Sequence, residues 1–426
     1  MSKPQTDLTA TFAGVVGSAN ILANPALSLD GIAPALLVKP ASAREAADCL
    51  RLCAERRIAV VPAGRAMWLE CGNPLRRADV VLSLERMSRI VDYSAPDLTV
   101  TVEAGMTLNE LNEKTGRDRL WLPLDPPGAA ASVGAVVACN SSGALRGGYG
   151  TPRDYVIGLK LAHADGSESK SGGRVVKNVA GYDLNKLYVG SYGTLAVITE
   201  ATFKLRPLPE RSVTIALTQK QPERLTSLAR QIRASELQPV AFVLASTPVV
   251  ERLGLRNAAT ALLLRFADNE AAVTHQVNWL RQTCGIEREV DEVTGDAESA
   301  LWTRINNMAD ESAAVIRMSV PLAQTAVACE RMLEEGETAI TADFSSGIIR
   351  AACSGNDDEV VCAMKGWRAM AQELGGTLFI EKAPLVVKQQ VDAWGEVGAS
   401  ERLMKALKEK FDPQGILNPG RFVASI

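Results

Sequence analysis

The chain has 426 residues, enough for more than one folded core. Its content of 47% hydrophobic and 22% charged residues is typical of a soluble protein, and a net charge of −3 provides no broad positive field for nucleic acid or an anionic membrane. No stretch of about 18 apolar residues occurs, so we predict no membrane span. The eight cysteines include no C-x-x-C pair, which favours buried reduced thiols over a metal or iron–sulfur site.

A first strand–helix–strand unit follows a lead-in over residues 1–34. A short apolar strand is expected at 35–38. Ser42 and Glu45 then have the spacing of a capping box, in which each side chain accepts a main-chain N–H at the start of a helix. Apolar residues at helical spacing continue this helix, and residues 58–61 return as a strand. Because a helix joins the two strands, they should run parallel.

A second unit of the same kind follows. Strands are expected at 80–84 and 98–104, and Thr107 opens a second capping box at the start of a short helix. Residues 120–124 should then return to the sheet. A further strand at 156–162 ends in an Asp-Gly pair, which is a hairpin signal.

Between these elements, nearly every residue of the segment 131–143 is small. The segment lacks the long polar side chains of an amphipathic surface helix. Small residues allow a backbone to approach a ligand or another helix closely. On its own, the segment fits a tightly packed internal helix equally well. The glycine-rich residues 147–150 that follow favour a ligand.

The chain is organised around residues 174–206. The polar first half, K-N-V-A-G-Y-D-L at 177–184, predicts a loop and a short helix. The second half begins with a tight turn, G-S-Y-G-T at 190–194, and continues in β-branched and aromatic residues that favour a buried strand pair. The two glycines of the turn let the backbone approach something flat or phosphorylated.

The chain changes character after Pro209. Strands are expected near 213–217, 240–245, 261–266, 316–320, 348–352 and 377–380, alternating with helices near 223–234, 271–284, 322–333 and 358–374. This alternation predicts an α+β domain. A last helix at 400–410 ends before the run D-P-Q-G-I-L-N-P-G.

These motifs, in this order, resemble the flavin oxidoreductases of the vanillyl-alcohol-oxidase type, which have a PCMH-type FAD-binding domain. K-N-V-A-G-Y-D-L followed by G-S-Y-G-T-L is most similar to the FAD-binding subunits of bacterial glycolate oxidases. The resemblance implies an α+β fold with a two-part FAD-binding domain over 35–209. It further implies a cap domain with an antiparallel sheet over 210–399, and a C-terminal segment, 400–426, that packs back on the FAD domain.

The resemblance also implies contacts with FAD. In the family, the turn after the first unit forms a nest of main-chain N–H groups for the FAD diphosphate, and the S-V-G-A segment opens a helix whose N–H groups point at it. The implied contacts are Pro62, Ala63, Gly64, Arg65, Ala66, Met67, Leu124, Asp125, Ser132, Val133, Gly134, Ala135, Ala138, Asn140, Ser142, Gly143, Tyr149, Gly193, Thr194, Ile198 and Asn418.

The turn at 62–67 departs from the family pattern. It has a single glycine, Gly64, and Ala66 and Met67 stand where the family has a small glycine and a hydroxyl residue. Relatives that bond the flavin covalently use a His or Cys near this turn, and none occurs there. Cys71 lies too far along the chain, so we predict FAD that dissociates.

For a 2-hydroxy acid, the site needs a cation for the carboxylate and a base for the hydroxyl proton. Arg317 and Arg350 are the candidate cations in the cap, although for each of them extension to solvent or pairing with an internal carboxylate is slightly favoured. Tyr182 and Lys177 are candidates from the FAD domain, and Glu381 follows a cap strand. The chain has two histidines, both before the second half of the cap, so a histidine-based or metal-assisted mechanism is not expected.

Three hypotheses follow. In the first, the chain is the FAD-binding subunit of a glycolate-oxidase-like complex and passes electrons, beside a sister FAD-containing catalytic subunit and an iron–sulfur subunit. In the second, it oxidises a small 2-hydroxy acid unaided. In the third, it is a scaffold that has lost FAD. The polar start lacks the apolar core of a signal peptide, so a cytoplasmic protein is expected, attached to the inner face of the membrane through its partners.

Overall fold

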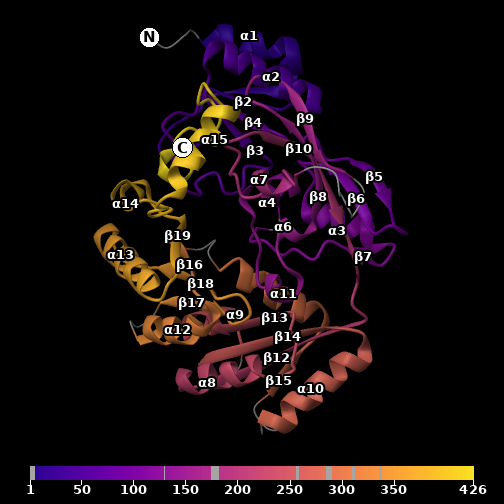
Figure 1. Cartoon of the computed structure of the whole chain (residues 1–426), viewed down its shortest axis with the longest axis vertical. Coiled ribbons are helices and arrows are strands. Elements are labelled where there is room, and N and C mark those ends of the chain that lie inside the picture. Colours follow the sequence, from indigo (N-terminus) through magenta and orange to yellow (C-terminus); the bar gives the residue numbers. More distant parts are fainter. Residues whose placement is uncertain are drawn as a thin grey trace. The chain divides into compact units, whose positions relative to one another are not determined.

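The computed structural model describes residues 5–128, 130–173, 182–255, 259–284, 290–308, 312–334 and 338–426, which form two compact units (Figure 1). Each unit combines segments that are distant in sequence. Unit 1 comprises Met1–Ser141, Thr151–Leu208 and Glu396–Ile426, and unit 2 comprises Ser142–Gly150 and Pro209–Gly395. None of the helices in the described ranges is both long enough and apolar enough to cross a membrane.

The first sheet of unit 1 has the strand order β1-β2-β4-β3. Its strands are β1 (Ile21–Ala23), β2 (Leu36–Val38), β3 (Val60–Ala63) and β4 (Val80–Ser83). Strands β2 and β3 run parallel, as predicted, but they are not neighbours, since each pairs in parallel with β4. The helices of unit 1 are α1 (Gln5–Val16), α2 (Ala43–Arg56), α3 (Leu108–Gly116), α4 (Val133–Cys139), α6 (Pro152–Tyr155), α7 (Asn185–Tyr188) and α15 (Ser400–Phe411).

Both predicted helix starts are present. At α3, the Glu110 N–H donates to the Thr107 hydroxyl over 3.1 Å and the Thr107 N–H donates to the Glu110 carboxylate over 2.9 Å, which is a complete capping box. At α2, the Glu45 N–H donates to the Ser42 hydroxyl over 3.1 Å. The Glu45 carboxylate, however, accepts from the N–H of Ala41 rather than that of Ser42, so this box closes one residue earlier than predicted.

The second sheet of unit 1 is antiparallel, with the order β5-β6-β10-β8-β9. Its strands are β5 (Ile90–Ser94), β6 (Thr99–Glu103), β8 (Val156–Ala162), β9 (Glu168–Gly172) and β10 (Val197–Lys204). The run predicted as a buried strand pair is the single central strand β10, which pairs with β6 and β8. The predicted hairpin joins β8 to β9.

The prediction that residues 120–124 return to the sheet is wrong. Strand β7 (Leu120–Trp121) pairs with β11 (Arg206–Pro207) in a separate two-stranded ribbon. Pro123, Pro126 and Pro127 follow closely, and because proline has no N–H to donate to a strand ladder, the strand cannot extend.

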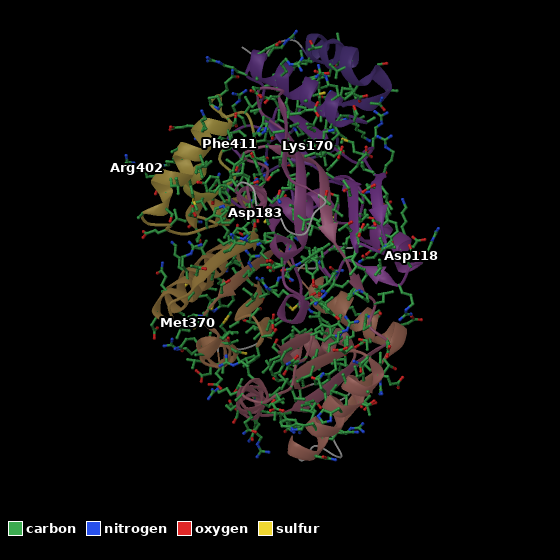
Figure 2. All side chains as sticks on the ribbon, turned by 45° about the vertical axis from the view of Figure 1, so that its right-hand side comes forward. Asp118, Lys170, Asp183, Met370, Arg402 and Phe411 are labelled. Atoms are coloured by element: carbon green, nitrogen blue, oxygen red, sulfur yellow. The ribbon has the colours of Figure 1, made fainter. Side chains whose placement is uncertain are left out.

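The C-terminal segment packs on unit 1, as the resemblance implied. The Val60 N–H donates to the carbonyl of Ile416 over 2.7 Å, and the Asn418 N–H donates to the carbonyl of Val60 over 2.9 Å. The segment thus extends the first sheet beside β3. Figure 2 labels Arg402 near the start of α15 and Phe411 at its end, where the Phe411 ring packs against those of His163 and Tyr188.

Unit 2 is built on one eight-stranded antiparallel sheet, as the resemblance implied for the cap, with the order β15-β12-β14-β13-β17-β18-β16-β19. Its strands are β12 (Arg211–Gln219), β13 (Ala241–Ala245), β14 (Thr260–Asp268), β15 (Val290–Val293), β16 (Ala314–Ser319), β17 (Ala339–Asp343), β18 (Ile348–Cys353) and β19 (Thr377–Lys382). Its helices are α5 (Arg146–Tyr149), α8 (Pro222–Arg233), α9 (Thr247–Leu253), α10 (Glu270–Cys284), α11 (Gly295–Asn306), α12 (Thr325–Glu334), α13 (Asp357–Glu373) and α14 (Leu385–Gln390).

Candidate functional site

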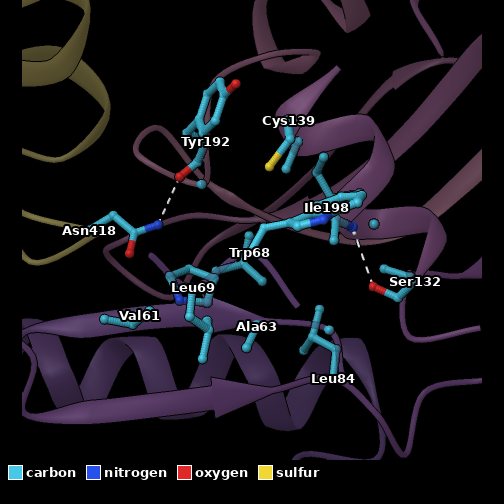
Figure 3. Close-up of a pocket in the computed structure, with 18 of the residues that line it drawn as sticks. Val61, Ala63, Trp68, Leu69, Leu84, Ser132, Cys139, Tyr192, Ile198 and Asn418 are labelled. Carbon is cyan, nitrogen blue, oxygen red and sulfur yellow. Dashed lines mark hydrogen bonds between the residues drawn. The ribbon is translucent and has the colours of Figure 1, made fainter. Parts of the chain in front are cut away.

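Unit 1 contains a pocket of about 710 Å³, counted with its open mouth. Four segments supply its walls: β3 with the turn after it, α4, the turn at 190–194 with the start of β10, and the C-terminal segment (Figure 3). The lining residues are Val61, Pro62, Ala63, Gly64, Met67, Trp68, Leu69, Cys71, Leu84, Ala104, Ser132, Gly134, Ala135, Ala138, Cys139, Tyr192, Gly193, Ala196, Val197, Ile198, Asn418 and Arg421.

The turn after β3 needs a glycine where it meets α4. A β-carbon on Gly64 would lie 1.8 Å from the hydroxyl oxygen of Ser132 and 2.7 Å from its β-carbon, so no larger residue fits. Ser132 is fully buried and caps α4 by accepting from the Ala135 N–H over 3.4 Å (Figure 3). Gly64 therefore lets the turn close on the helix.

The same turn adopts the geometry of an anion nest with fewer glycines than the family pattern. Ala66 and Trp68 have left-handed φ angles of 59° and 57°. Within the residues that the structure describes, the main-chain N–H groups of Arg65, Ala66 and Met67 have no acceptor. Unpaired N–H groups in a turn with left-handed residues are a typical cradle for phosphate oxygens. Despite the substitutions noted in the sequence, the turn therefore keeps three main-chain N–H groups with no acceptor among the described residues.

The first N–H groups of helix α4 donate within the protein, so the helix lines the pocket without offering them to a diphosphate. The Val133 N–H donates to the carbonyl of Met106 over 2.8 Å, and the Gly134 N–H donates to that of Ala104 over 2.9 Å. A β-carbon on Gly134 would lie 2.7 Å from that of Ala104. The small residues predicted to face a ligand thus also allow α4 to pack on the end of β6.

The C-terminal wall offers an unused hydrogen-bond acceptor. Asn418 has a left-handed φ of 43°, and its side-chain N–H donates to the carbonyl of Tyr192 over 2.8 Å. Its side-chain oxygen is buried and, within the described part of the chain, has no partner. An unsatisfied buried acceptor is costly, so this oxygen fits the donor groups of a bound cofactor. Beside it, Arg421 pairs with Asp30 over 2.8 Å, both almost fully buried.

Two cysteines that the sequence did not predict for this site line the pocket. Cys71 follows the turn after β3, and Cys139 is the last residue of α4, with its sulfur turned toward the pocket in Figure 3. In the sequence, Cys71 lies too far along the chain from the turn to be a candidate, and no motif assigns a role to Cys139. The fold brings both thiols to the site.

Eleven of the expected FAD contacts line this pocket: Pro62, Ala63, Gly64, Met67, Ser132, Gly134, Ala135, Ala138, Gly193, Ile198 and Asn418. The others do not, although several lie beside it. They are Arg65, Ala66, Leu124, Asp125, Val133, Asn140, Ser142, Gly143, Tyr149 and Thr194. Arg65 is paired with Glu110 over 3.0 Å, and Leu124, Val133 and Thr194 are buried. Ser142, Gly143 and Tyr149 belong to unit 2.

Unit 2 has a smaller pocket of about 440 Å³ lined by several charged side chains. It brings together both arginines predicted as carboxylate-binding groups. Its lining residues are Ser142, Gly143, Ala144, Arg146, Val243, Ile305, Asn306, Arg317, Thr341, Asp343, Ile348 and Arg350.

A carboxylate of the protein already lies among the arginines of this pocket. Arg350 donates to Glu381 through two nitrogens, over 2.9 and 2.7 Å, and to the carbonyl of Asn306 over 2.8 Å. Arg317 lies 4.0 Å from Glu381 and over the ring of Phe379. Burial alone would raise the pKa of Glu381, but the positive charges of Arg350, Arg317 and Arg146 outweigh it and lower that pKa. Arg350 is therefore held by an internal carboxylate.

Asp343 is the other titratable group of this pocket. It is 6% exposed, and burial raises its pKa although the hydrogen bonds from Ser345 and Ser346 oppose the shift. Its two oxygens accept from both serine hydroxyls and from the Ser345 N–H. Asp343 is thus held rigidly at the wall.

Neither Tyr182 nor His163 lines either pocket. Tyr182 is 92% exposed, and Lys177 lies outside the described residues. His163 is hydrogen-bonded to Ser169 over 2.6 Å, and burial lowers its pKa. Among the described residues, no group of three His, Cys, Asp or Glu side chains is placed to hold a metal ion.

Comparison with known families gives two matches. Residues 34–171 match the FAD binding domain, and residues 355–422 match the C-terminal domain of FAD linked oxidases. The chain is a flavoprotein with a PCMH-type FAD-binding domain. FAD is the cofactor of this flavoprotein, and the hypothesis of a scaffold without FAD loses its support. The two matched regions meet at the unit 1 pocket, since β3 and α4 fall in the first and Asn418 in the second.

Curated relatives of the flavoprotein align over most of its length. Glycolate oxidase subunit GlcD of Bacillus subtilis is 29% identical over 92% of this chain and 89% of the relative. D-lactate dehydrogenase of Archaeoglobus fulgidus is 28% identical, with 92% of each chain covered. The mitochondrial D-lactate dehydrogenase [cytochrome] of Arabidopsis thaliana is 27% identical, with 92% and 73% covered.

Solved structures confirm the fold of the flavoprotein. p-Cresol methylhydroxylase superposes with a TM-score of 0.77 over 99% of this chain and 97% of the other, at 15% identity. The 4-ethylphenol oxidase of Gulosibacter chungangensis superposes with a TM-score of 0.75 over the same shares, also at 15% identity. At this identity the likeness concerns the fold alone.

Proposed function

We propose that this flavoprotein binds FAD non-covalently in the unit 1 pocket and serves as the FAD-binding subunit of a glycolate-oxidase-like complex that oxidises a small 2-hydroxy acid. The observation that carries the proposal is the pocket itself, which joins both family-matched regions. It offers the N–H groups after β3 for the diphosphate and the oxygen of Asn418 for a donor group of the cofactor. Bound FAD would supply hydride acceptance and onward electron transfer.

The lack of a histidine at the unit 2 pocket favours a subunit over a self-contained enzyme. Neither His163, in unit 1, nor His275, on the outer side of α10, lines that pocket. Arg350 is already paired with Glu381, so it does not offer a free cation to a substrate. A sister FAD-containing subunit would then bind the substrate, and an iron–sulfur subunit would take the electrons. The names of the relatives are consistent with this chemistry.

A second candidate, a self-contained 2-hydroxy-acid dehydrogenase, is favoured by one observation. Arg317 and the buried Asp343, whose pKa is raised, line the same pocket. In this case Arg317 would hold the carboxylate and Asp343 would accept the hydroxyl proton. Tyr182 and Arg350 would then have no direct role.

Anaerobic mixing of the purified chain with glycolate and D-lactate tests the proposal. We expect yellow protein whose flavin absorbance is not bleached by the chain alone, because the base and the free cation are supplied by the partner. Co-expression with the sister FAD-containing subunit and the iron–sulfur subunit should restore bleaching of the flavin absorbance. Bleaching by the isolated chain would establish the second candidate, and failure to retain or take up FAD would refute both.

Whether FAD is bound non-covalently needs its own control, because Cys71 and Cys139 line the pocket. Denaturation followed by filtration should release all of the yellow colour into the filtrate. Colour that remains with the protein would show a covalent bond.

A further inference from the structure

A buried lysine, Lys408, connects the C-terminal helix to two walls of the unit 1 pocket. It lies in α15 and is 8% exposed. Its ammonium group donates to the carbonyl of Thr194 over 2.9 Å, to the carbonyl of Leu417 over 2.8 Å and to the carboxylate of Asp412 over 2.6 Å. An ammonium group has three protons, so each one is used.

Asp412 completes this arrangement from the other side. It is 2% exposed and accepts from the N–H groups of Ile416 and Leu417 over 3.0 and 2.8 Å. One ion pair therefore fixes the end of α15, the start of the C-terminal segment and the turn at 190–194. Hydrogen bonds with a charged partner are the stronger ones, and a low-dielectric surrounding strengthens them further.

Neither Lys408 nor Asp412 lines the pocket, but the two carbonyls that Lys408 binds adjoin residues that do. Thr194 follows Gly193, and Leu417 precedes Asn418. The side chain of Asn418 donates to the carbonyl of Tyr192, so the two walls are joined a second time on the pocket side (Figure 3). The distance between the turn and the C-terminal wall is thus set by two connections, one inside the pocket and one behind it.

We propose that Lys408 is a positioning residue for FAD, which holds the turn at 190–194 and the Asn418 wall at the separation that the cofactor needs. The inference rests on the proposed FAD site in unit 1. A lysine that only stabilised the fold would change the affinity for FAD no more than any other substitution that lowers stability by the same amount. The two roles are therefore separable by experiment.

The test uses a double substitution, because Lys408→Met alone leaves the charge of Asp412 buried and unpaired, which is strongly destabilising. Lys408→Met with Asp412→Asn removes both charges, and the Asn oxygen still accepts from Leu417. Lys408→Arg, which retains the charge opposite Asp412, is the second variant. Its planar guanidinium cannot direct three protons from one atom to three converging acceptors.

We expect the double variant to bind FAD roughly tenfold more weakly than the wild type, since a lost hydrogen bond to a charged group is worth about that factor. Lys408→Arg should show a smaller weakening in the same direction. The measurement is the FAD Kd of the apoprotein, by flavin fluorescence, beside the apoprotein Tm and the visible spectrum of the bound flavin, which should shift in the double variant.

Two matched controls separate position from stability. Lys405→Met removes an exposed lysine of the same helix, paired with Glu401, and should leave the FAD Kd unchanged. Thr214→Val lowers stability within unit 2, where the Thr214 hydroxyl bonds Glu298 and Trp302, and should lower the Tm without changing the FAD Kd. An FAD Kd that changes no more in the Lys408 variants than in these controls would overturn the inference. A wild-type chain that binds no FAD would instead overturn the proposed function.

Discussion

Gly64→Ala is expected to weaken FAD binding by about 10–100-fold. The added methyl group would lie 1.8 Å from the hydroxyl oxygen of Ser132, and Ser132 cannot move away without uncapping α4. Overpacking of this kind costs about 1–3 kcal/mol, and each 1.4 kcal/mol is a factor of ten in affinity. The turn and α4 would separate, and both contribute walls to the pocket.

Titration of the apoprotein with FAD measures this effect. Gly116→Ala is the matched control, because a β-carbon there meets nothing within 4 Å and the residue ends a helix of the same unit. The control should bind FAD like the wild type. If Gly64→Ala also kept the wild-type FAD Kd, the turn after β3 would not be part of the cofactor site.

Glu381→Gln is expected to destabilise the protein by about 3 kcal/mol, because it removes the negative charge of the buried ion pair that Glu381 forms with Arg350. For a unit of this size the melting temperature should fall by about 6–12 °C. Glu373→Gln, which breaks an exposed pair with Arg331, should cost less than about 1 kcal/mol.

The stability that Glu381 contributes should decrease as the pH falls. Its pKa in the folded protein lies below the ordinary value of 4.5. The stability that its charge contributes is therefore fully present above that value and is lost as the pH falls through the folded pKa. The difference in unfolding free energy between wild type and Glu381→Gln should be large at pH 7 and shrink in acid, as the pH falls through the lowered pKa of Glu381. A difference that grew in acid would contradict this assignment.

Sequence patterns predicted the local structure well where the signals are local. The capping box at Thr107 depends on two residues three positions apart, and the hairpin after β8 depends on the Asp165-Gly166 pair in the short loop between β8 and β9. The order of the strands was not predictable in the same way. Strand β4 inserts between β2 and β3, and β7 leaves the sheet for β11, because these pairings are decided by packing between distant segments.

In the candidate site too, residues that belong to local motifs were predictable, and residues that only the fold brings together were not. Gly64, Gly193 and Asn418 were predicted from motifs, and all three line the pocket. Cys71 and Cys139 were not predicted to line the site, because Cys71 is distant from the turn along the chain and Cys139 had no role of its own in the small-residue segment 131–143. The folded chain brings both to the pocket. Lys408 resembles any lysine of a surface helix in the sequence, because its i+4 spacing to Asp412 is common on exposed helix faces. Its other two acceptors, the carbonyls of Thr194 and Leu417, lie outside the helix.

The thiols of Cys71 and Cys139 give the most direct test of the FAD site. Cys71 and Cys139 line the pocket, whereas Cys362 is exposed elsewhere. Burial raises the pKa of Cys49 and of Cys329 to about 12, so these two should stay unreactive toward iodoacetamide with or without FAD.

The measurement is the alkylation rate of each cysteine by mass spectrometry, in the apoprotein and with FAD at about ten times its Kd. Mass action then leaves about a tenth of the pockets open, so the rates at Cys71 and Cys139 should fall about tenfold while that at Cys362 stays the same. Equal rates at Cys71 and Cys139 with and without FAD, in protein that demonstrably binds FAD, would show that the cofactor lies elsewhere.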